Sequence, residues 1–367
     1  MKRSITLKLL PYLIPALLLA AVTSCKKDHT VNIAPIGKYE NGFFIVNEGN
    51  YGHDHGGTIT YFDYKTATLT DSTYTKENPG KTFDPNTSSL EFGTVYNGSL
   101  YLLTKSGGPL VVADALSLKE QGRIAATGTN DWRAFIGIDK TKGLVSTVNG
   151  IYPIDLQTIS LGTMLTSVTG EVGDMIKAGN YIFVLSATDG VVILNASDYS
   201  VAKKIAGLEV AFAKTPDGAV WAGGGNTLAR IDPATLAVQN IAVPFTVNGS
   251  WGFPGTWHVG SIAASTTENA VYLANNQPFE GGTDIYKYTA ANSSSFTKPF
   301  ITTPSGTEMY GKGFGYDAKQ NQLIVTTVHT GFDFNDNDLI FYDAGSATLL
   351  KDIKFTGNYF PATPVFH

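Results

Sequence analysis

Short apolar segments recur along this chain, and each is followed by a second apolar segment and then by a turn. In residues 178–207, Tyr181–Leu185 and Val191–Leu194 are apolar at every position, and the more polar Tyr199–Ile205 follows them. Successive side chains of a strand point to opposite faces of its sheet, so a strand that is apolar throughout needs cover on both faces. The pattern predicts a small antiparallel sheet packed between two copies of itself.

Seven segments are equivalent to the first of these strands: Gly42–Val46, Ser99–Leu103, Gly143–Thr147, Tyr181–Leu185, Ala219–Ala222, Ala270–Ala274 and Gln322–Thr326. The next strand of a unit usually ends in Asp or Asn, at Asp63, Asp114, Asp155, Asn195, Asp232 and Asp343. Such side chains accept hydrogen bonds from backbone N–H groups two residues on and favour a turn. A period of about 40 to 50 residues with four short strands per unit is typical of a β-propeller. We therefore predict an all-β fold, a seven-bladed β-propeller.

The two ends of the chain indicate how this ring closes. The strand at Phe43 has no innermost strand before it, and the chain ends with the strand-like segment 359–366, YFPATPVF. We expect this C-terminal segment to complete blade 1 as its innermost strand. The first and last blades would then have no unpaired edge between them.

The first 25 residues follow a different pattern. Lys2, Arg3 and Lys8 precede an apolar run from Leu9 to Val22, and the small residues after it end at Cys25, the one cysteine of the chain. This arrangement resembles a bacterial lipobox, which implies a signal peptide at residues 1–24 and lipidation of Cys25. An ordinary signal peptide or an uncleaved anchor is the alternative, although the run is short for a bilayer span. We expect a tether at residues 25–37 and the propeller domain at 38–367.

The charge of the chain limits its partners. Residues 1–24 hold three of the 26 Lys and Arg and none of the 31 Asp and Glu, so the mature protein has a formal charge of −8. An acidic domain without a basic stripe argues against nucleic acid as a partner.

Loop lengths indicate where a ligand would bind. One rim of a propeller channel is formed by the loops that lead into the innermost strands and by those that join the second and third strands. Loops of the second kind are long in blades 1, 6 and 7, at Asn47–Gly57, Asn275–Gly282 and His329–Asp338, and these blades become neighbours when the ring closes. The corresponding loops of blades 2 to 5 are short, at Lys105–Pro109, Asn149–Tyr152, Thr188–Gly190 and Gly223–Asn226. Long loops on a rigid scaffold often serve function.

Aromatic and polar residues gather in both kinds of loop. Flat apolar surface with a few polar groups suits a pocket for a sizeable organic ligand. The candidate ligand-binding residues are Tyr51, His53, Trp132, Arg133, Asp174, Trp257, His258, Tyr310, Lys312, Phe332 and Tyr359. The alternative is that Trp132 and Trp257 pack between blades as part of the core.

Metal binding and catalysis have less support in the sequence. The loop residues His53, Asp54 and His55 offer two imidazoles, but the chain has no HExxH or CxxC pattern, and we predict no metal and no cofactor. It also has no GxSxG motif or phosphate-binding loop, and only His258 with Glu171 or Asp174 suggests an acid/base pair. We expect a binding protein and no enzyme.

The first blade resembles a known group of proteins. Residues 43–50, FFIVNEGN, and 57–63, GTITYFD, resemble surface lipoprotein propellers of the Bacteroidota, relatives of the YVTN-repeat propellers. Some members of that group capture vitamin B12 and similar corrinoids and pass them to an outer-membrane TonB-dependent transporter. Lys26, Lys27 and Asp28 also resemble the short charged signal that directs such lipoproteins to the cell surface.

The resemblance implies a protein of the outer membrane at the cell surface, held to the membrane by its lipid alone. It implies that the propeller rim binds a corrinoid or another sizeable small molecule and delivers it to a transporter. Two alternatives stay open. One is a scaffold for protein–protein interaction, and the other is a lyase or hydrolase with an active site at the rim, for which the streptogramin-cleaving lyases are a precedent.

Overall fold

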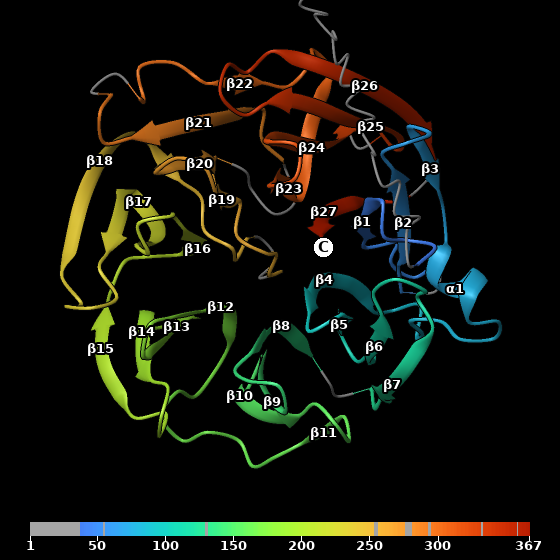
Figure 1. Ribbon diagram of the computed structural model, residues 1–367, viewed down its shortest axis with the longest axis horizontal. Helices are drawn as coiled ribbons and strands as arrows, with labels where there is room; N and C mark the ends of the chain where they lie inside the picture. Colours follow the sequence, from blue (N-terminus) through green and yellow to red (C-terminus); the bar gives the residue numbers. More distant parts are fainter. Residues whose placement is uncertain are drawn as a thin grey trace, which may run out of the picture. The chain divides into compact units, whose positions relative to one another are not determined.

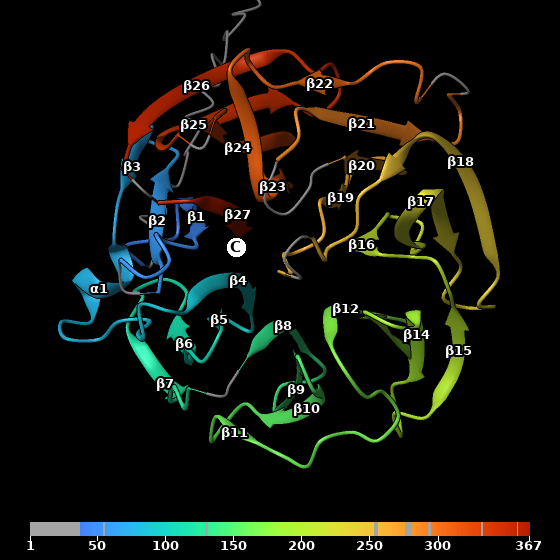
Figure 2. The same cartoon turned by 180° about the vertical axis from the view of Figure 1, so that it is seen from behind.

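Seven antiparallel sheets stand around a common axis (Figure 1), and Figure 2 shows the same ring from behind. The computed structural model describes residues 37–53, 56–128, 131–252, 256–275, 281–292, 295–331, 333–357 and 359–367. The predicted signal peptide, Cys25 and the tether up to residue 36 lie outside these residues, as do Asp54, His55 and Phe332.

Each sheet is one blade, and its strands are named below in order from the axis outward. Blades 1 and 2 consist of β27 (Pro361–Phe366), β1 (Gly42–Asn47), β2 (Thr58–Asp63) and β3 (Thr68–Thr70), and of β4 (Ser89–Tyr96), β5 (Ser99–Lys105), β6 (Leu110–Asp114) and β7 (Glu120–Ile124). Blades 3 and 4 consist of β8 (Trp132–Gly137), β9 (Lys142–Thr147), β10 (Gly150–Asp155) and β11 (Ser160–Leu161), and of β12 (Val172–Ala178), β13 (Tyr181–Ser186), β14 (Gly190–Asn195) and β15 (Val201–Ile205). A short helix, α1 (Thr73–Glu77), lies between blades 1 and 2 in the chain.

Blade 5 has three strands, and the remaining two blades have four each. Blade 5 consists of β16 (Val210–Lys214), β17 (Val220–Ile231) and β18 (Val238–Val247). Blades 6 and 7 consist of β19 (Ile262–Ala264), β20 (Ala270–Ala274), β21 (Asp284–Thr289) and β22 (Ile301–Thr302), and of β23 (Thr307–Asp317), β24 (Gln322–His329), β25 (Asp333–Asp343) and β26 (Leu349–Thr356).

The C-terminal strand closes the ring, as the sequence predicted. β27 pairs antiparallel with β1, with Phe366 opposite Phe43 and Val365 opposite Phe44. The innermost strands also contact one another in cyclic order, and β27 contacts both β23 of blade 7 and β4 of blade 2. The fold is therefore a seven-bladed propeller in which the first and last strands of the chain share one sheet.

The fully apolar strands pack on both faces, which explains their composition. In β1, the alternate residues Phe43 and Ile45 join a core cluster with blade 7, and Phe44 and Val46 join one with blade 2. All of them are fully buried. Burying one such side chain stabilises a fold by about 1.5 to 3 kcal/mol, so each inter-blade layer contributes to holding the ring without a disulfide.

Asp side chains fix the turn that leads into the outermost strand in five of the blades. In each of these turns, an Asp Oδ1 atom accepts hydrogen bonds from the backbone N–H groups two and three residues on; the residues are Asp63, Asp114, Asp155, Asp232 and Asp343. Blade 4 differs, because Asp198 accepts from the N–H of Ser200 and Asn195 donates to the Ser200 hydroxyl.

Two predicted loops are wrong in detail. Residues 223–226 lie inside β17, whose first part pairs with β16 and whose second part pairs with β18. In blade 7, residues 333–338 of the predicted long loop belong to β25, because this strand pairs with β26 as far as Asp336. Polar residues alternate there along a strand edge, which resembles a loop when only composition is considered.

Candidate functional site

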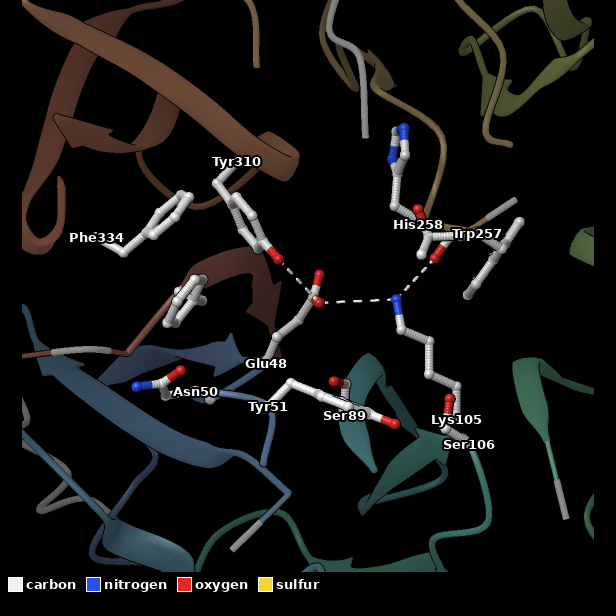
Figure 3. Close-up of a pocket in the computed structure, with 13 residues that line it drawn as sticks. Glu48, Asn50, Tyr51, Ser89, Lys105, Ser106, Trp257, His258, Tyr310 and Phe334 are labelled. Atoms are coloured by element: carbon white, nitrogen blue, oxygen red, sulfur yellow. Dashed lines mark hydrogen bonds and ion pairs between the residues drawn. The ribbon is translucent and has the colours of Figure 1, made fainter. Parts of the chain in front are cut away.

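A pocket of about 580 Å³ opens at one rim of the channel, where blades 7, 1 and 2 meet the segment that leads into blade 6. Its walls come from the two kinds of loop that the sequence analysis selected and from the strand ends beside them. The lining residues are Glu48, Gly49, Asn50, Tyr51, Ser89, Lys105, Ser106, Thr256, Trp257, His258, Tyr310, Phe334 and Phe360 (Figure 3). Its volume is in the range of sites that bind drug-sized molecules.

A buried network of charged groups forms the floor. Lys105, at the end of β5, places its Nζ atom 2.5 Å from Glu91 Oε2 of β4 and 3.0 Å from the carbonyl oxygen of Trp257. The same ammonium lies 3.6 Å from Glu48 Oε2, to which the Tyr310 hydroxyl of β23 donates a hydrogen bond of 3.2 Å. Figure 3 shows Glu48 and Lys105 pointing toward each other across the pocket. The network therefore joins blades 1, 2 and 7 and the segment before blade 6.

Burial and proximity shift the ionisation of this floor. Burial and the neighbouring Glu48 carboxylate raise the pKa of Glu91 well above its usual value, although Lys105 opposes the shift. The pKa of Lys105 is raised, because attraction to Glu48 and Glu91 outweighs the effect of burial. Burial and Glu48 also raise the pKa of Tyr310. Burial therefore favours the neutral forms of Glu91 and Tyr310, whereas the neighbouring carboxyl groups favour the charged form of Lys105.

The backbone of the final segment holds Glu48 in place. The N–H groups of Glu48 and Gly49 donate hydrogen bonds of 3.0 Å to the carbonyl oxygens of Phe360 and Tyr359. Gly49 has φ +78°, and a Cβ atom there would lie 2.8 Å from the backbone nitrogen of Gly57. A side chain at this position would strain the loop and meet its returning strand, so glycine permits the close approach.

Aromatic rings form one wall of the pocket. Phe334 and Phe360 stack with ring centroids 4.5 Å apart, and Tyr310 packs edge-on against Phe360 at 5.4 Å. Tyr51 has 59% of its surface exposed, at the mouth. Trp257 is buried, and the Arg133 guanidinium lies 5.9 Å from the centre of its ring. These rings offer a flat surface to a ligand. Tyr51 is the ring among them that is exposed to solvent.

His258 lines this pocket as a neutral imidazole. Its Nδ1 atom lies 2.6 Å from the carbonyl oxygen of Val259, which can only accept, so the proton is on Nδ1. Burial lowers the pKa of the ring to about 4. The predicted acid/base partners bind elsewhere, since Glu171 pairs with Arg133 and Asp174 accepts from the N–H of Gly260.

The structure brings together some of the predicted site residues and separates the others. Tyr51, Trp257, His258 and Tyr310 line the pocket; Trp132, Arg133, Asp174, Lys312, Tyr359 and His53 do not line it. Phe332 is outside the described residues. The candidates outside the pocket lie elsewhere for different physical reasons.

Trp132 and Arg133 act behind the pocket wall. Trp132 is buried in the core cluster of blades 2 and 3, and its indole N–H donates a hydrogen bond of 2.9 Å to the carbonyl of Gly108. This residue is core, as the alternative interpretation held. Arg133 is buried and forms ion pairs with Asp131 and with Glu171, so its charge is already compensated.

Asp174 and Lys312 lie deeper along the axis. They line a separate cavity of about 270 Å³ with residues of the innermost strands. Burial raises the pKa of Asp174 to about 7, whereas burial lowers that of Lys312.

The remaining two side chains point elsewhere. The Tyr359 ring packs 6.0 Å from Phe355, so only the backbone of Tyr359 contributes to the pocket. His53 is exposed on the loop after Tyr51.

Glu48, Glu91, Lys105, Phe334 and Phe360 belong to the site but were not among the predicted residues. Glu48 and Phe334 lay within the long loops that the sequence analysis selected. Lys105 opens a loop that was set aside as short, and Glu91 is a single carboxylate in an otherwise apolar strand, Leu90–Phe92. A charge enclosed by apolar neighbours is the signal that could have identified Glu91, since such a group needs a buried partner.

Two further properties concern only the described part of the chain. Within it, no three or more His, Cys, Asp or Glu side chains gather in a group able to hold a metal ion. No helix in this part of the chain is long and apolar enough to cross a bilayer.

Sequence comparison identifies the family. Residues 41–367 match the family described as "Domain of unknown function (DUF5074)", and the chain belongs to this family. No curated protein sequence is significantly similar to the chain.

Solved structures show the fold at low sequence identity. Apo AztD from Citrobacter koseri is 12% identical with a TM-score of 0.51, over 89% of this chain and 98% of that one. A chain of the mitotic checkpoint complex is 13% identical with a TM-score of 0.57, over 83% and 89%. Dihydro-heme d1 dehydrogenase NirN, in complex with DHE, is 10% identical with a TM-score of 0.54, over 89% and 75%. Similarity at this level concerns the propeller fold alone.

Proposed function

We propose that this member of the DUF5074 family captures a small organic molecule in the pocket between blades 7, 1 and 2. The observation that supports this most directly is the pocket itself, because about 580 Å³ of space is bordered by several aromatic rings and a few polar groups. A pocket of this composition buries a flat ligand and orients it by hydrogen bonds. A protein-binding scaffold would instead offer a broad and flatter apolar surface.

We propose a corrinoid as the leading ligand, on the strength of the resemblance of the first blade to corrinoid-capturing surface lipoproteins. The same loop, residues 47–53, contributes Glu48 and Tyr51 to the pocket. A corrinoid is larger than a drug-sized ligand, so the pocket would enclose one edge of it while the rest lies at the mouth beside the exposed Tyr51. The chain would then deliver the ligand to an outer-membrane TonB-dependent transporter.

The ligand is tested by mixing the full-length protein, purified in detergent, with cobalamin and passing the mixture through a desalting column. Coloured ligand that elutes with the protein supports capture. A colourless protein fraction at ligand concentrations well above micromolar contradicts the corrinoid proposal. The variant Tyr51→Ala should lower the amount bound, while Val201→Ala, which changes an exposed residue of the outer strand β15, serves as the control.

We also propose that Cys25 is lipidated and anchors the mature protein in the outer membrane at the cell surface. The test is metabolic labelling with a radioactive fatty acid in cells that express the wild type or Cys25→Ala. Label in the wild type alone supports the anchor, and equal labelling of both contradicts it. Protease treatment of intact cells then tests whether the propeller faces outward.

A further inference from the structure

We infer that the pocket takes in a nitrogen hydrogen-bond donor of its ligand, a primary amide or an ammonium group, against Glu48, and that it rejects a carboxylate there. The inference rests on the proposal that this pocket binds a small molecule, and it adds the chemical class of the ligand group that contacts Glu48. The polar atoms of the floor decide this class, because some of them are already paired within the protein and others are not.

The positive charge of the floor is compensated by groups of the protein. Lys105 Nζ has Glu91 Oε2 at 2.5 Å, the carbonyl oxygen of Trp257 at 3.0 Å and Glu48 Oε2 at 3.6 Å. The first two oxygens accept hydrogen bonds from the ammonium, and Glu48 adds an ion pair, so three groups of the protein already compensate this charge. The other nearby cation, Arg133, is held by Asp131 and Glu171 behind Trp257. An anionic ligand group would therefore find no unpaired cation in the floor.

Glu48 and His258 place acceptor atoms in the floor and wall of the pocket. The hydrogen bond from Tyr310 and the ion pair with Lys105 both use Oε2 of Glu48. Its Oε1 atom therefore remains for a ligand, on a side chain that is only 8% exposed and lines the pocket. The buried Nε2 atom of His258 has no partner within the described residues, and it is an acceptor because the proton is on Nδ1. The indole N–H of Trp257 also has no hydrogen-bond partner within the described residues. It lies against Gly173 of β12, so we do not count it as a donor to the ligand.

The protonation of the floor reinforces this preference. The groups that face Glu48 are Lys105 on β5, Glu91 on β4 and Tyr310 on β23. Burial favours the neutral forms of Glu91 and Tyr310, and Lys105 is the cation among these three groups. Hydrogen bonds that involve a charged group are stronger than neutral ones, so a ligand N–H donor to Glu48 gains binding energy. A ligand carboxylate would meet Glu48 with like charge.

The test uses three probes that share one aromatic body: tryptamine, indole-3-acetamide and indole-3-acetate. Their dissociation constants for the full-length protein are measured at pH 7.5 by ligand-observed NMR. We expect tryptamine and indole-3-acetamide to bind at least about tenfold more tightly than indole-3-acetate, the effect of one charge-assisted hydrogen bond. Glu48→Gln offers an amide in place of the carboxylate, so the difference between acetamide and acetate should fall to within about twofold.

The control is Glu268→Gln, which removes an exposed carboxylate of blade 6 and should leave the ranking unchanged. The inference is overturned if indole-3-acetate binds the wild type as tightly as the acetamide, if the ranking survives Glu48→Gln, or if neither donor probe binds at about 10 mM. The wild-type ranking decides the matter even if Glu48→Gln does not fold. Failure of cobalamin to bind would not alter this ranking, so the two proposals fail separately.

Discussion

The ammonium of Lys105 lies 2.5 Å from Glu91 Oε2, and this contact ties the end of β5 to the innermost strand β4 beneath the pocket. Both groups are buried, so the pair exchanges a large desolvation cost for mutual attraction. Such a pair adds little to the free energy of unfolding compared with apolar residues of the same shape, but removal of one partner leaves the other uncompensated.

We therefore predict that Lys105→Met lowers the free energy of unfolding by about 3 to 5 kcal/mol. The double variant Lys105→Met/Glu91→Leu should recover most of this loss, because the second change removes the uncompensated carboxyl group. Urea denaturation of the variants measures both values. Additive destabilisation in the double variant would contradict the coupling.

The two predicted tryptophans should respond differently to substitution. Trp132→Ala removes a buried ring and its hydrogen bond to Gly108, and we expect a loss of about 3 to 5 kcal/mol in the free energy of unfolding. Trp257→Phe keeps an aromatic ring in the wall, and we expect the protein to fold but to bind indole-3-acetamide more weakly by about 1 to 2 kcal/mol. Thermal unfolding and NMR titration provide the readouts. Unchanged probe affinity in Trp257→Phe would show that this ring is only structural.

Two buried groups near the axis titrate in opposite senses. Asp174 has a folded pKa of about 7, raised by burial, so its contribution to stability is present below the unfolded pKa and is lost as pH rises to about 7. His258 has a folded pKa of about 4, lowered by burial, so its contribution is present above the unfolded pKa and is lost as pH falls toward 4. Between pH 5 and 7.5 each contribution changes by roughly 2 kcal/mol, and the changes largely cancel.

Substitution of one group should expose the pH dependence of the other. Asp174→Asn should gain stability relative to the wild type by roughly 2 kcal/mol between pH 5 and 7.5, and His258→Gln should lose about as much over the same interval. Urea denaturation at the two pH values gives these differences. Parallel pH profiles for the wild type and both variants would contradict the assignment.

The closing strand should be essential for stability. Val365 of β27 is buried in the cluster between blades 1 and 2, so Val365→Ala should lower the free energy of unfolding by about 2 kcal/mol. Val201→Ala, at a position 41% exposed on β15, is the matched control and should change it by less than about 0.5 kcal/mol. Deletion of residues 361–367 should prevent cooperative folding, because β1 would lose its inner neighbour. Equal effects of the two valine substitutions, measured by urea denaturation, would contradict this role for β27.

The repeat pattern was sufficient to predict the fold, because strands that pack on both faces must be apolar in both side-chain phases. It also located β27, since a closed ring needs an inner strand beside Phe43. Individual side chains of the site were harder to predict. The pairing register shifts in the innermost strands, between Trp132 and Phe135 in β8 and between Met309 and Phe314 in β23. A bulge changes which residues face the axis, so alternation along these strands does not tell Trp132, which is core, from Tyr310, which lines the pocket.

Side-chain contacts between different blades could not be predicted from the sequence either. Lys105 and Glu91 lie on adjacent strands of one blade, but their partner Glu48 belongs to another blade, and Tyr310 to a third. Nothing in the local sequence fixes how loops of different blades approach each other over the axis. Loop length therefore selected the rim at which the pocket lies and omitted Lys105, whose loop is short.

Closure of the ring by β27 also determines when the pocket can form during synthesis of the chain. Glu48 is among the earliest pocket residues to be synthesised, and the backbone hydrogen bonds that position it come from Phe360 and Tyr359, which are among the final ones. These hydrogen bonds can therefore form only after the strands of blades 2 to 7 have been synthesised. The position of Glu48 is thus fixed late in synthesis, although the residue itself is made early.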